Sequence, residues 1–377
     1  MDSKLVIVGY YGFNNIGDEA VLYSMLRTLR SMRGDLKITV LSNEPEKTSK
    51  VYGVQAANRF RLKEVVKTIS QGSLIILGGG SLFQDITSQK SLFYYSGIVL
   101  LAKLLRKKVF FYNQGVGPVT RNLSKRLLKW VFNKVDLITV RDAASKELLL
   151  EIGVAEPEIL VKADAVLGIY AQEMERKQGL RYLEKNGLVL GEKDSPVIGI
   201  SVRDWRDYQG YKKALAFVGD ELVKKGYQVV FLPFHFPDDI APSREIANLM
   251  KEQATVIRDQ LGVVEMLGAL SGLQLLIGMR LHSLIMASVM EIPVVGISYD
   301  PKVDAFMKLL GQPLAGRVET LDGELLMKEV WHILLKRDEV LEGLRESLSG
   351  MRMEARDTAR LALEVAGTDQ PFLSSKD

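Results

Sequence analysis

Short apolar runs alternate with segments of helical periodicity along most of this chain, and no other feature constrains its fold as strongly. Each run ends in a polar or glycine-containing turn, which is typical of a buried strand. The runs occupy residues 4–9, 36–41, 73–77, 108–113, 136–140, 159–167, 197–202, 227–235, 254–257, 273–277 and 292–297. Strands that alternate with helices form βαβ units, so the sequence predicts an α/β fold with doubly wound parallel sheets.

The length of 377 residues is too great for one ordinary hydrophobic core, so two domains are expected. The strand and helix pattern weakens over a polar stretch between residues 170 and 195. We therefore predict two Rossmann-like domains with a cleft between them. The expected parts are a first domain over 1–170, a linker over 171–195, a second domain with C-terminal helices over 196–366 and a polar tail over 367–377.

The composition excludes several classes of site and partner. The chain has no cysteine, which excludes disulfides, thiolate metal sites and cysteine nucleophiles. Its formal net charge of +4 gives no reason to expect a nucleic-acid partner. His235, His282 and His332 lie far apart and lack the spacing of a metal site, so no metal and no cofactor are predicted. No signal peptide or membrane span is apparent, and a cytoplasmic protein is expected.

The stretch 273–302 is the expected chemical centre. Arg280, His282 and Lys302 each fall just past the end of a predicted strand or in the first turn of the helix that follows. Ligands of open α/β sheets bind at this edge. Fixed cations beside helix N-termini make an anion site, and a nearby histidine can supply a proton.

Glycine-rich turns are the corresponding candidates in the first domain, at residues 9–17, 78–81 and 115–117. Glycine lets backbone amides approach a ligand closely, although such turns are also common without a ligand. The candidate substrate-binding residues are Asn15, Gly17, Asp18, Gly79, Gly80, Ser81, Gln114 and Gly115. A phosphate-binding P-loop is excluded because Asp18 stands where lysine is needed. A dinucleotide-binding loop is disfavoured because none of these turns has the pattern G-x-G-x-x-G. Asp18 and Asp85 are interpreted as helix caps in preference to sugar ligands.

Six stretches in order resemble the polysaccharide pyruvyl transferase family, in particular its CsaB type from bacterial cell-wall polymer assembly. They are GYYGFNNIGDEA (9–20), LGGGSLFQD (77–85), NQGVGP (113–118), TVRD (139–142), GMRLHSLIMA (278–287) and GISYDPKV (296–303). The resemblance implies a fold similar to two-domain GT-B glycosyltransferases. It also implies transfer of pyruvate from phosphoenolpyruvate (PEP) to a sugar, which gives a cyclic ketal and releases phosphate. The acceptor of the CsaB type is an N-acetylmannosamine unit of a secondary cell-wall polymer, expected on a lipid-linked precursor.

The resemblance assigns catalytic roles to Arg141, Arg280, His282 and Lys302. Arg280 and Lys302 are expected to hold the phosphate, and His282 to act as an acid or as a base. Arg203 is added as a substrate-binding residue because it follows the first strand of the second domain. Four of these five residues also have a structural interpretation. His282 packs against the sheet, Lys302 is a solvated turn residue, Arg141 pairs with Asp142, and Arg203 pairs with Asp204.

Other functions stay open. A GT-B glycosyltransferase would need a donor-binding acid, for which Asp300 and Asp304 are candidates, and a non-catalytic anion- or glycan-binding protein would need no histidine beside its cations. The basic region over 103–134 can contact an anionic membrane that carries a lipid-linked acceptor. A solvated helix whose apolar stripe faces the core is the favoured interpretation of that region.

Overall fold

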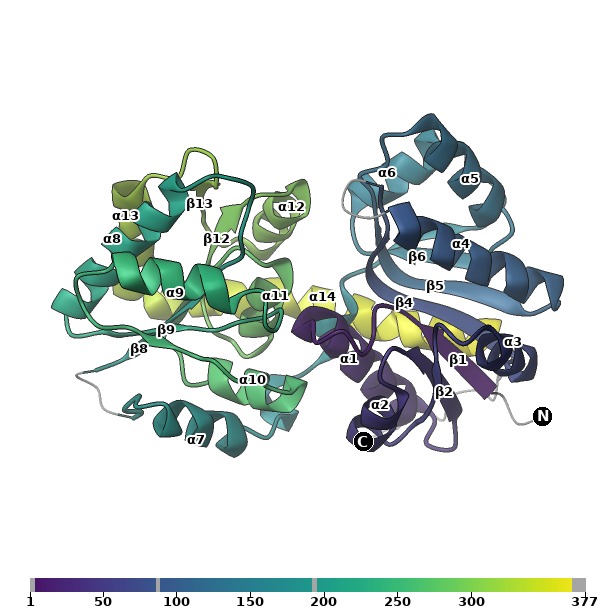
Figure 1. Ribbon diagram of the computed structural model, residues 1–377, viewed down its shortest axis with the longest axis horizontal. Coiled ribbons are helices and arrows are strands. Elements are labelled where there is room, and N and C mark those ends of the chain that lie inside the picture. The colour runs from purple at the N-terminus through teal and green to yellow at the C-terminus, as the bar shows by residue number, and fades with distance from the viewer. Residues whose placement is uncertain (1–3, 86–88, 192–194, 368–377) are drawn as a thin grey trace. The chain divides into compact units, whose positions relative to one another are not determined.

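The computed structural model describes residues 4–85, 89–191 and 195–367, and it divides the chain into two compact units. Unit 1 comprises Met1–Phe13, Asp18–Gly168 and Met351–Asp377, and unit 2 comprises Asn14–Gly17 and Ile169–Gly350. Each unit contains one parallel sheet covered by helices (Figure 1). The predicted class of two doubly wound α/β domains is confirmed.

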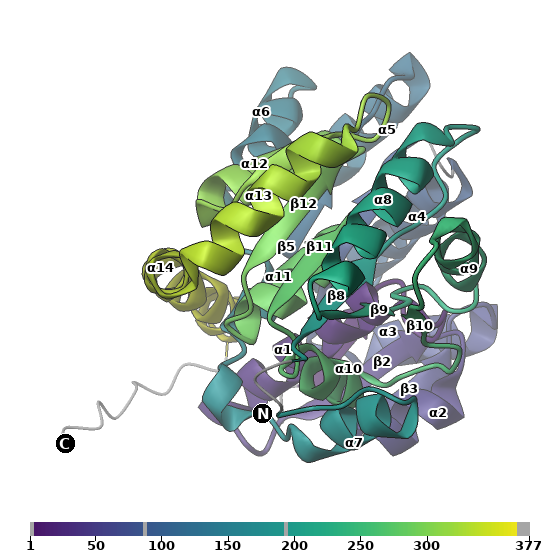
Figure 2. The same ribbon diagram turned by 90° about the vertical axis from the view of Figure 1, so that its left-hand side faces the viewer.

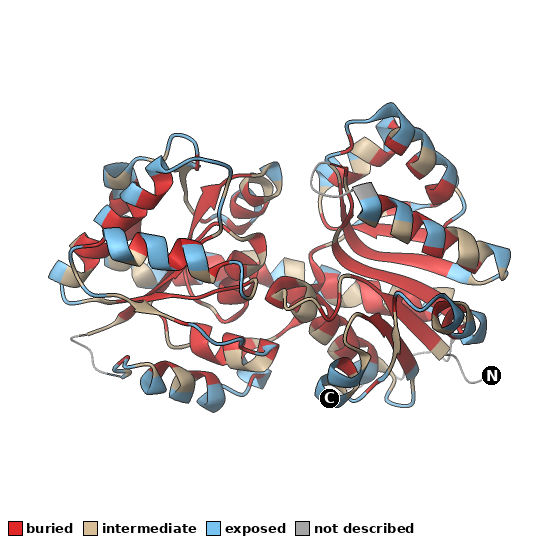
Figure 3. Ribbon diagram, viewed as in Figure 1, coloured by how far each residue is buried: buried red, intermediate tan, exposed pale blue. Residues whose placement is uncertain are grey.

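Unit 1 contains a seven-stranded sheet in the order β3-β2-β1-β4-β5-β6-β7, with all neighbours parallel. Its strands are β1 (Lys4–Val8), β2 (Lys37–Ser42), β3 (Gln55–Asn58), β4 (Leu74–Phe83), β5 (Lys108–Val116), β6 (Leu137–Val140) and β7 (Ile159–Val161). Its helices are α1 (Ile16–Met32), α2 (Pro45–Tyr52), α3 (Leu62–Gln71), α4 (Gln89–Leu104), α5 (Asn122–Phe132) and α6 (Ala143–Glu151). The central strands are buried on both faces, which explains their continuous apolar runs (Figure 3).

Unit 2 contains a six-stranded sheet in the order β10-β9-β8-β11-β12-β13, again parallel throughout. Its strands are β8 (Val197–Ser201), β9 (Gln228–Phe231), β10 (Thr255–Val256), β11 (Leu275–Gly278), β12 (Val294–Ser298) and β13 (Leu314–Arg317). Its helices are α7 (Lys177–Lys185), α8 (Gly210–Lys224), α9 (Ile240–Leu249), α10 (Val263–Leu270), α11 (Leu281–Val289), α12 (Pro301–Leu310) and α13 (Gly323–Leu335). Figure 2 shows α8 and α13 side by side over this sheet.

The structure differs from the expected domain boundaries. The last helix, α14 (Arg337–Val365), begins in unit 2, but its residues from Met351 onward belong to unit 1. There the Thr358 hydroxyl donates to Asn113 Oδ1 at 2.9 Å. The expected linker contains α7, which packs so closely on α10 that a Cβ on Gly179 would lie 2.1 Å from the backbone nitrogen of Ala269. The long unbroken helix α14 and the polar amphipathic helix α7 carry no signal in the sequence that would mark a domain boundary.

The expected glycine-rich turns at 78–81 and 115–117 are largely strand, which corrects the prediction. β4 continues to Phe83 and β5 to Val116, and Gly80 pairs with Gln114 across them. Glycine is required at 79 because a Cβ there would lie 2.4 Å from Cγ1 of Val21 in α1. Tertiary pairing therefore overrides the low strand propensity of glycine. The expected strand 159–167 also stops early, since a 3₁₀ turn occupies Ala165–Gly168.

Candidate functional site

Three cationic side chains of unit 2 follow three neighbouring strands. Arg203 follows β8, Arg280 follows β11, and Lys302 lies in the first turn of α12 after β12. Because β8, β11 and β12 are adjacent and parallel, their carboxyl ends meet at one edge of the sheet. The fold thus gathers residues that are far apart in the sequence at the edge where ligands of this sheet type bind.

The side chain of Tyr299 is the common neighbour of these cations. Arg203 Nη1 donates to the Tyr299 hydroxyl at 3.3 Å, and its guanidinium carbon lies 4.8 Å from the centre of the ring. Lys302 Nζ lies 5.7 Å from the same ring centre. Burial alone would raise the pKa of Tyr299, but Lys302, Arg203 and Arg280 outweigh it and lower the pKa below its ordinary value. The surroundings of this phenol therefore favour negative charge.

Asp239 orients Arg280. Its carboxylate accepts hydrogen bonds from Nε of Arg280 at 2.6 Å and from Nη2, which is a bidentate pair. It also accepts the backbone amides of Phe234 at 3.0 Å and His235 at 2.8 Å. The Asp239 side chain is 1% exposed and that of Arg280 is 15% exposed. The described hydrogen bonds of Arg280 to this aspartate leave Nη1 for a ligand.

Arg203 and Lys302 differ in their partners. Lys302 Nζ lies 3.2 Å from Oδ2 of Asp300, and the other oxygen of that carboxylate caps α12. Arg203 takes part in none of the ion pairs among the described residues. Asp204, its expected partner, instead pairs with Lys212 at 2.8 Å. The interpretation of Arg203 as one half of a local ion pair is therefore wrong, and its charge is available to an anionic ligand.

His282 lies in the first turn of α11, and its ring packs against Gly17. A Cβ on Gly17 would lie 2.4 Å from Nδ1 of His282. The amide of Gly17 donates to Oδ1 of Asn15 at 3.1 Å, and Asn15 forms an isolated β-bridge with His235. The predicted residues Asn15, Gly17 and His282 therefore come together within unit 2.

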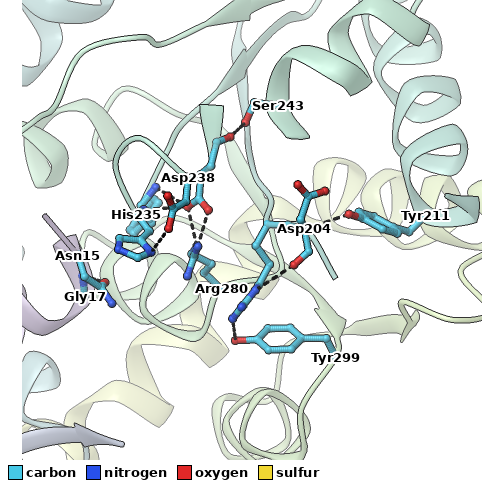
Figure 4. Close-up of polar contacts among 12 residues, drawn as sticks. Asn15, Gly17, Asp204, Tyr211, His235, Asp238, Ser243, Arg280 and Tyr299 are labelled. Carbon is cyan, nitrogen blue, oxygen red and sulfur yellow. Dashed lines mark hydrogen bonds and ion pairs between the residues drawn. The ribbon is translucent and has the colours of Figure 1, made fainter. Parts of the chain in front are cut away.

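His235 is a second histidine at this site, which the sequence analysis considered only as a metal ligand. Its Nδ1 lies 3.2 Å from Oδ2 of Asp238 (Figure 4). Burial lowers the pKa of His235, and the nearby positive charge of Arg280 lowers it further. The neutral imidazole is thus favoured beside the cationic group.

Arg141 lies in unit 1, where its guanidinium is held by two side chains. Nη1 lies 3.2 Å from Oδ2 of Asp164, and Nη2 donates to the hydroxyl of Ser81 at 2.9 Å. Gly115 provides the space, because a Cβ there would lie 2.6 Å from Nη2. The structure therefore brings together the predicted residues Arg141, Ser81 and Gly115. It adds Asp164 as the main carboxylate partner, while Asp142 Oδ2 is more distant at 3.8 Å and Oδ1 caps α6.

Four other predicted residues of unit 1 have structural contacts. Gly80 has φ +82°, and a Cβ on it would lie 2.7 Å from Oδ1 of Asp18, in the first turn of α1. Gln114 is fully buried, and its Nε2 donates to the carbonyl of Leu77 at 2.8 Å. Gly79 lies under α1, as described above. These contacts give Gly79, Gly80 and the Gln114 amide nitrogen structural roles, and they place Asp18 beside Gly80.

Asp85 has a structural contact, although it differs from the expected helix cap, since the N-cap of α5 is Arg121 without a side-chain cap. Its carboxylate accepts the backbone amides of Thr120 and Arg121, both at 2.9 Å, where the chain enters α5. Burial would raise the pKa of Asp85, but these hydrogen bonds outweigh it and lower the pKa. The ionised carboxylate therefore anchors the start of α5.

The basic region over 103–134 contains a solvated helix whose apolar stripe faces the core, as the favoured interpretation predicts. The apolar stripe of α5 faces the core through the buried side chains Leu128, Val131 and Phe132. Leu123 and Trp130 are exposed, at 69% and 55%, and Lys134 Nζ lies 5.2 Å from the ring of Trp130. Within the described ranges, no helix has the length and apolar character needed to cross a membrane.

A separate hollow of about 410 Å³ lies in unit 1, at the first turns of α2 and α3. It is lined by Glu44, Pro45, Glu46, Lys47, Asn58, Arg61 and Glu64. Its charges pair locally, with Lys47 at 3.3 Å from Glu44 and Arg61 at 3.1 Å from Glu64. None of these residues belongs to the predicted site. The convergent, incompletely paired cations are those of unit 2.

Several known structures share the architecture of this chain. UDP-N-acetylglucosamine 2-epimerase from Neisseria meningitidis, bound to UDP-N-acetylglucosamine, has a TM-score of 0.66 and 13% identity, covering 97% of this chain and all of its own. The corresponding enzyme from Methanocaldococcus jannaschii has a TM-score of 0.67 and 14% identity, covering 96% and 99%. Anabaena HepE bound to UDP-glucose has a TM-score of 0.65 and 12% identity, covering 97% and 100%. These likenesses show a GT-B-like fold.

Sequence comparison identifies the family. The amylovoran biosynthesis protein AmsJ of Erwinia amylovora is 24% identical over 384 residues, which cover 86% of this chain and 91% of that protein. The profile of the polysaccharide pyruvyl transferase family matches residues 15–301, most of the chain. That range contains Arg141, Arg203, Arg280 and His282 and stops one residue before Lys302. The chain therefore belongs to the polysaccharide pyruvyl transferase family.

Proposed function

We propose that this protein transfers pyruvate from PEP to two hydroxyl groups of a sugar, forming a cyclic ketal and releasing phosphate. Membership of the family supports pyruvate transfer to a polysaccharide. The observation that carries the choice of PEP as donor is the convergence of Arg203, Arg280 and Lys302 around Tyr299. PEP carries a phosphate and a carboxylate, and both groups need fixed cations.

The partners of the three cations suggest which cation binds which charged group of PEP. Arg203 has no carboxylate partner among the described residues, so it is the first candidate for the phosphate. Lys302 forms an ion pair with Asp300, and its side chain can turn toward the same phosphate. Arg280 is held by Asp239 and presents Nη1 in a fixed orientation. A small dianion matches this set better than a neutral sugar does.

His282 is the proposed proton-transfer residue for the acceptor. Its position in the first turn of α11, two residues after Arg280, places it beside the cationic group. A sugar hydroxyl becomes a better nucleophile when a base takes its proton as it attacks. Arg141, with Ser81 and Gly115, is proposed as a second substrate-binding group, within unit 1.

The acceptor we propose is an N-acetylmannosamine unit on a lipid-linked precursor of a secondary cell-wall polymer, as in CsaB-type enzymes. The name of the AmsJ relative refers to amylovoran biosynthesis, so an exopolysaccharide precursor is the alternative to include in an assay. We propose that the protein works in the cytoplasm and meets its acceptor through peripheral membrane contact by the basic 103–134 region. The exposed Leu123 and Trp130 support such contact. Flotation with anionic liposomes tests it, and absence of binding at every salt concentration would contradict it.

Calorimetric titration with PEP tests the donor, with UDP-N-acetylglucosamine as the comparison ligand. We expect saturable binding of PEP, weakened about tenfold or more in Arg203→Ala, because a charged hydrogen bond contributes about 1.5–3 kcal/mol. Arg206→Ala is the matched control, since Arg206 is an exposed arginine of the same loop. Binding of the nucleotide-sugar without PEP would contradict the proposal and favour a glycosyltransferase.

A further inference from the structure

We propose that Tyr299 is a catalytic residue of this site, which donates the proton that converts the methylene group of PEP into the methyl group of the ketal. The inference rests on the proposed function, since it assigns a step of that reaction. The phenol of Tyr299 lies among the cations of the site, and the reaction requires a proton at C3 of PEP.

The contacts of Tyr299 leave its proton available. The residue follows β12 directly and is 9% exposed, so its ring is fixed while the hydroxyl group lies among polar side chains. Arg203 donates to the phenol oxygen at 3.3 Å, and Trp205 packs on the ring with centres 4.8 Å apart. A phenol that accepts a hydrogen bond from a guanidinium still has its own O–H to donate.

The charges that face Tyr299 come from three elements. Arg203 lies on the loop after β8, Arg280 at the start of α11, and Lys302 in the first turn of α12. Two carboxylates, Asp239 and Asp300, pair with the second and third of these. In the ligand-free protein these net positive surroundings favour the phenolate, and the hydrogen bond from Arg203 can stabilise the phenolate that proton transfer leaves.

Binding of PEP would favour the protonated form of Tyr299. When the dianionic phosphate of PEP occupies the cationic group, it offsets the positive charge that favours the phenolate. The proton affinity of Tyr299 then rises, and any phenolate takes up a proton from solvent. Bound PEP is thereby matched with a protonated Tyr299, which is the form that the reaction needs.

The O–H bond of Tyr299 breaks, and the C2=C3 π electrons of PEP form a C–H bond at C3, leaving a cationic C2. The first sugar hydroxyl adds to C2 and gives its proton to His282, which passes that proton to the departing phosphate as the C2–O bond breaks. The second hydroxyl then adds to C2 and returns a proton to the Tyr299 phenolate. The net products are the ketal and hydrogen phosphate, with both residues restored.

Two variants and two measurements test this role. We expect Tyr299→Phe to lower kcat by about 100-fold or more, the usual contribution of a general acid, while calorimetry shows PEP affinity largely retained. Phenylalanine keeps the ring that packs against Trp205. Tyr208→Phe is the matched control, because Tyr208 is an exposed tyrosine on the loop after β8, and it should retain wild-type turnover.

A spectroscopic titration supplies a readout that a purely structural role would not give. We expect saturating PEP to move part of the near-ultraviolet phenolate absorbance of the wild-type protein to higher pH, and this change to vanish in Tyr299→Phe. Turnover unchanged in Tyr299→Phe, or phenolate titration unaffected by bound PEP, would overturn the role of Tyr299 while the proposed function stands. Absence of PEP binding to the wild type would overturn both, so the two failures are distinguishable.

Discussion

The carboxylate of Asp239 holds both Nε and Nη2 of Arg280 while it accepts two backbone amides from the loop after β9. One nearly inaccessible side chain thus fixes the orientation of a cation at the end of β11 and the path of the neighbouring loop. The pair explains why Arg280 is not free to act as a flexible phosphate ligand. Its guanidinium is preorganised, and the aspartate is a positioning residue for the site.

Replacement of Asp239 with asparagine should destabilise unit 2. The substitution leaves the partly buried Arg280 charge without its fully buried partner, which costs about 3 kcal/mol in the free energy of unfolding. Urea denaturation measures the loss, and Asp238→Asn is the control, because its side chain is 65% exposed and touches His235 instead. Equal stability of both variants would show that Arg280 does not depend on Asp239.

Gly17→Ala should impair catalysis through His282. The backbone at Gly17 permits alanine, but its Cβ would lie 2.4 Å from Nδ1 and must displace the imidazole. Misplacement of a catalytic group by about 1 Å can cost about 100-fold in rate, so kcat should fall by that order. Gly343→Ala in α14 is the control, since no atom lies within 4 Å of its added Cβ. Full turnover in Gly17→Ala would exclude a catalytic position for His282.

The chemical centre of unit 2 could be predicted because it depends on local signals. An apolar run that ends in a polar turn marks the carboxyl end of a buried strand, and Arg203, Arg280 and Lys302 all stand at such ends. Their convergence follows from the strand order β8-β11-β12, which the alternation of strands and helices favours but does not fix.

The partners of these residues could not be predicted, because they depend on tertiary contacts. Asp239 is one of two successive aspartates in a loop, and only the fold shows which one meets Arg280. Asp164 lies in a segment expected to be strand and instead sits beside Arg141. The path of α14 into unit 1 depends on contacts such as that of Thr358 with Asn113. Long-range contacts of this kind leave no periodicity in the sequence.

Arg141→Lys should weaken unit 1 although the positive charge is kept. Lysine cannot reproduce the fork that contacts Asp164 and Ser81 together, so a buried acceptor loses a charged hydrogen bond worth about 2 kcal/mol. The stability measured by chemical denaturation and the PEP-dependent turnover should both decline. Arg126→Lys is the control, because Arg126 is exposed on α5. If turnover falls without any loss of stability, the role of Arg141 is in catalysis alone.

The stability of the protein should depend on His235 between neutral and mildly acidic pH. Burial, then the charge of Arg280, lowers the pKa of this histidine in the folded state, so the unfolded chain binds a proton more readily. The contribution of His235 is fully present above its unfolded pKa of about 6.5, and it is lost as the pH falls toward the folded value. Stability measured by urea unfolding should therefore decline less between pH 7.5 and 5.5, about one unit either side of that pKa, in His235→Asn than in the wild type. His332→Asn, at an exposed histidine of α13, should retain the wild-type dependence, and an unchanged slope in His235→Asn would mean that other groups govern the acid response.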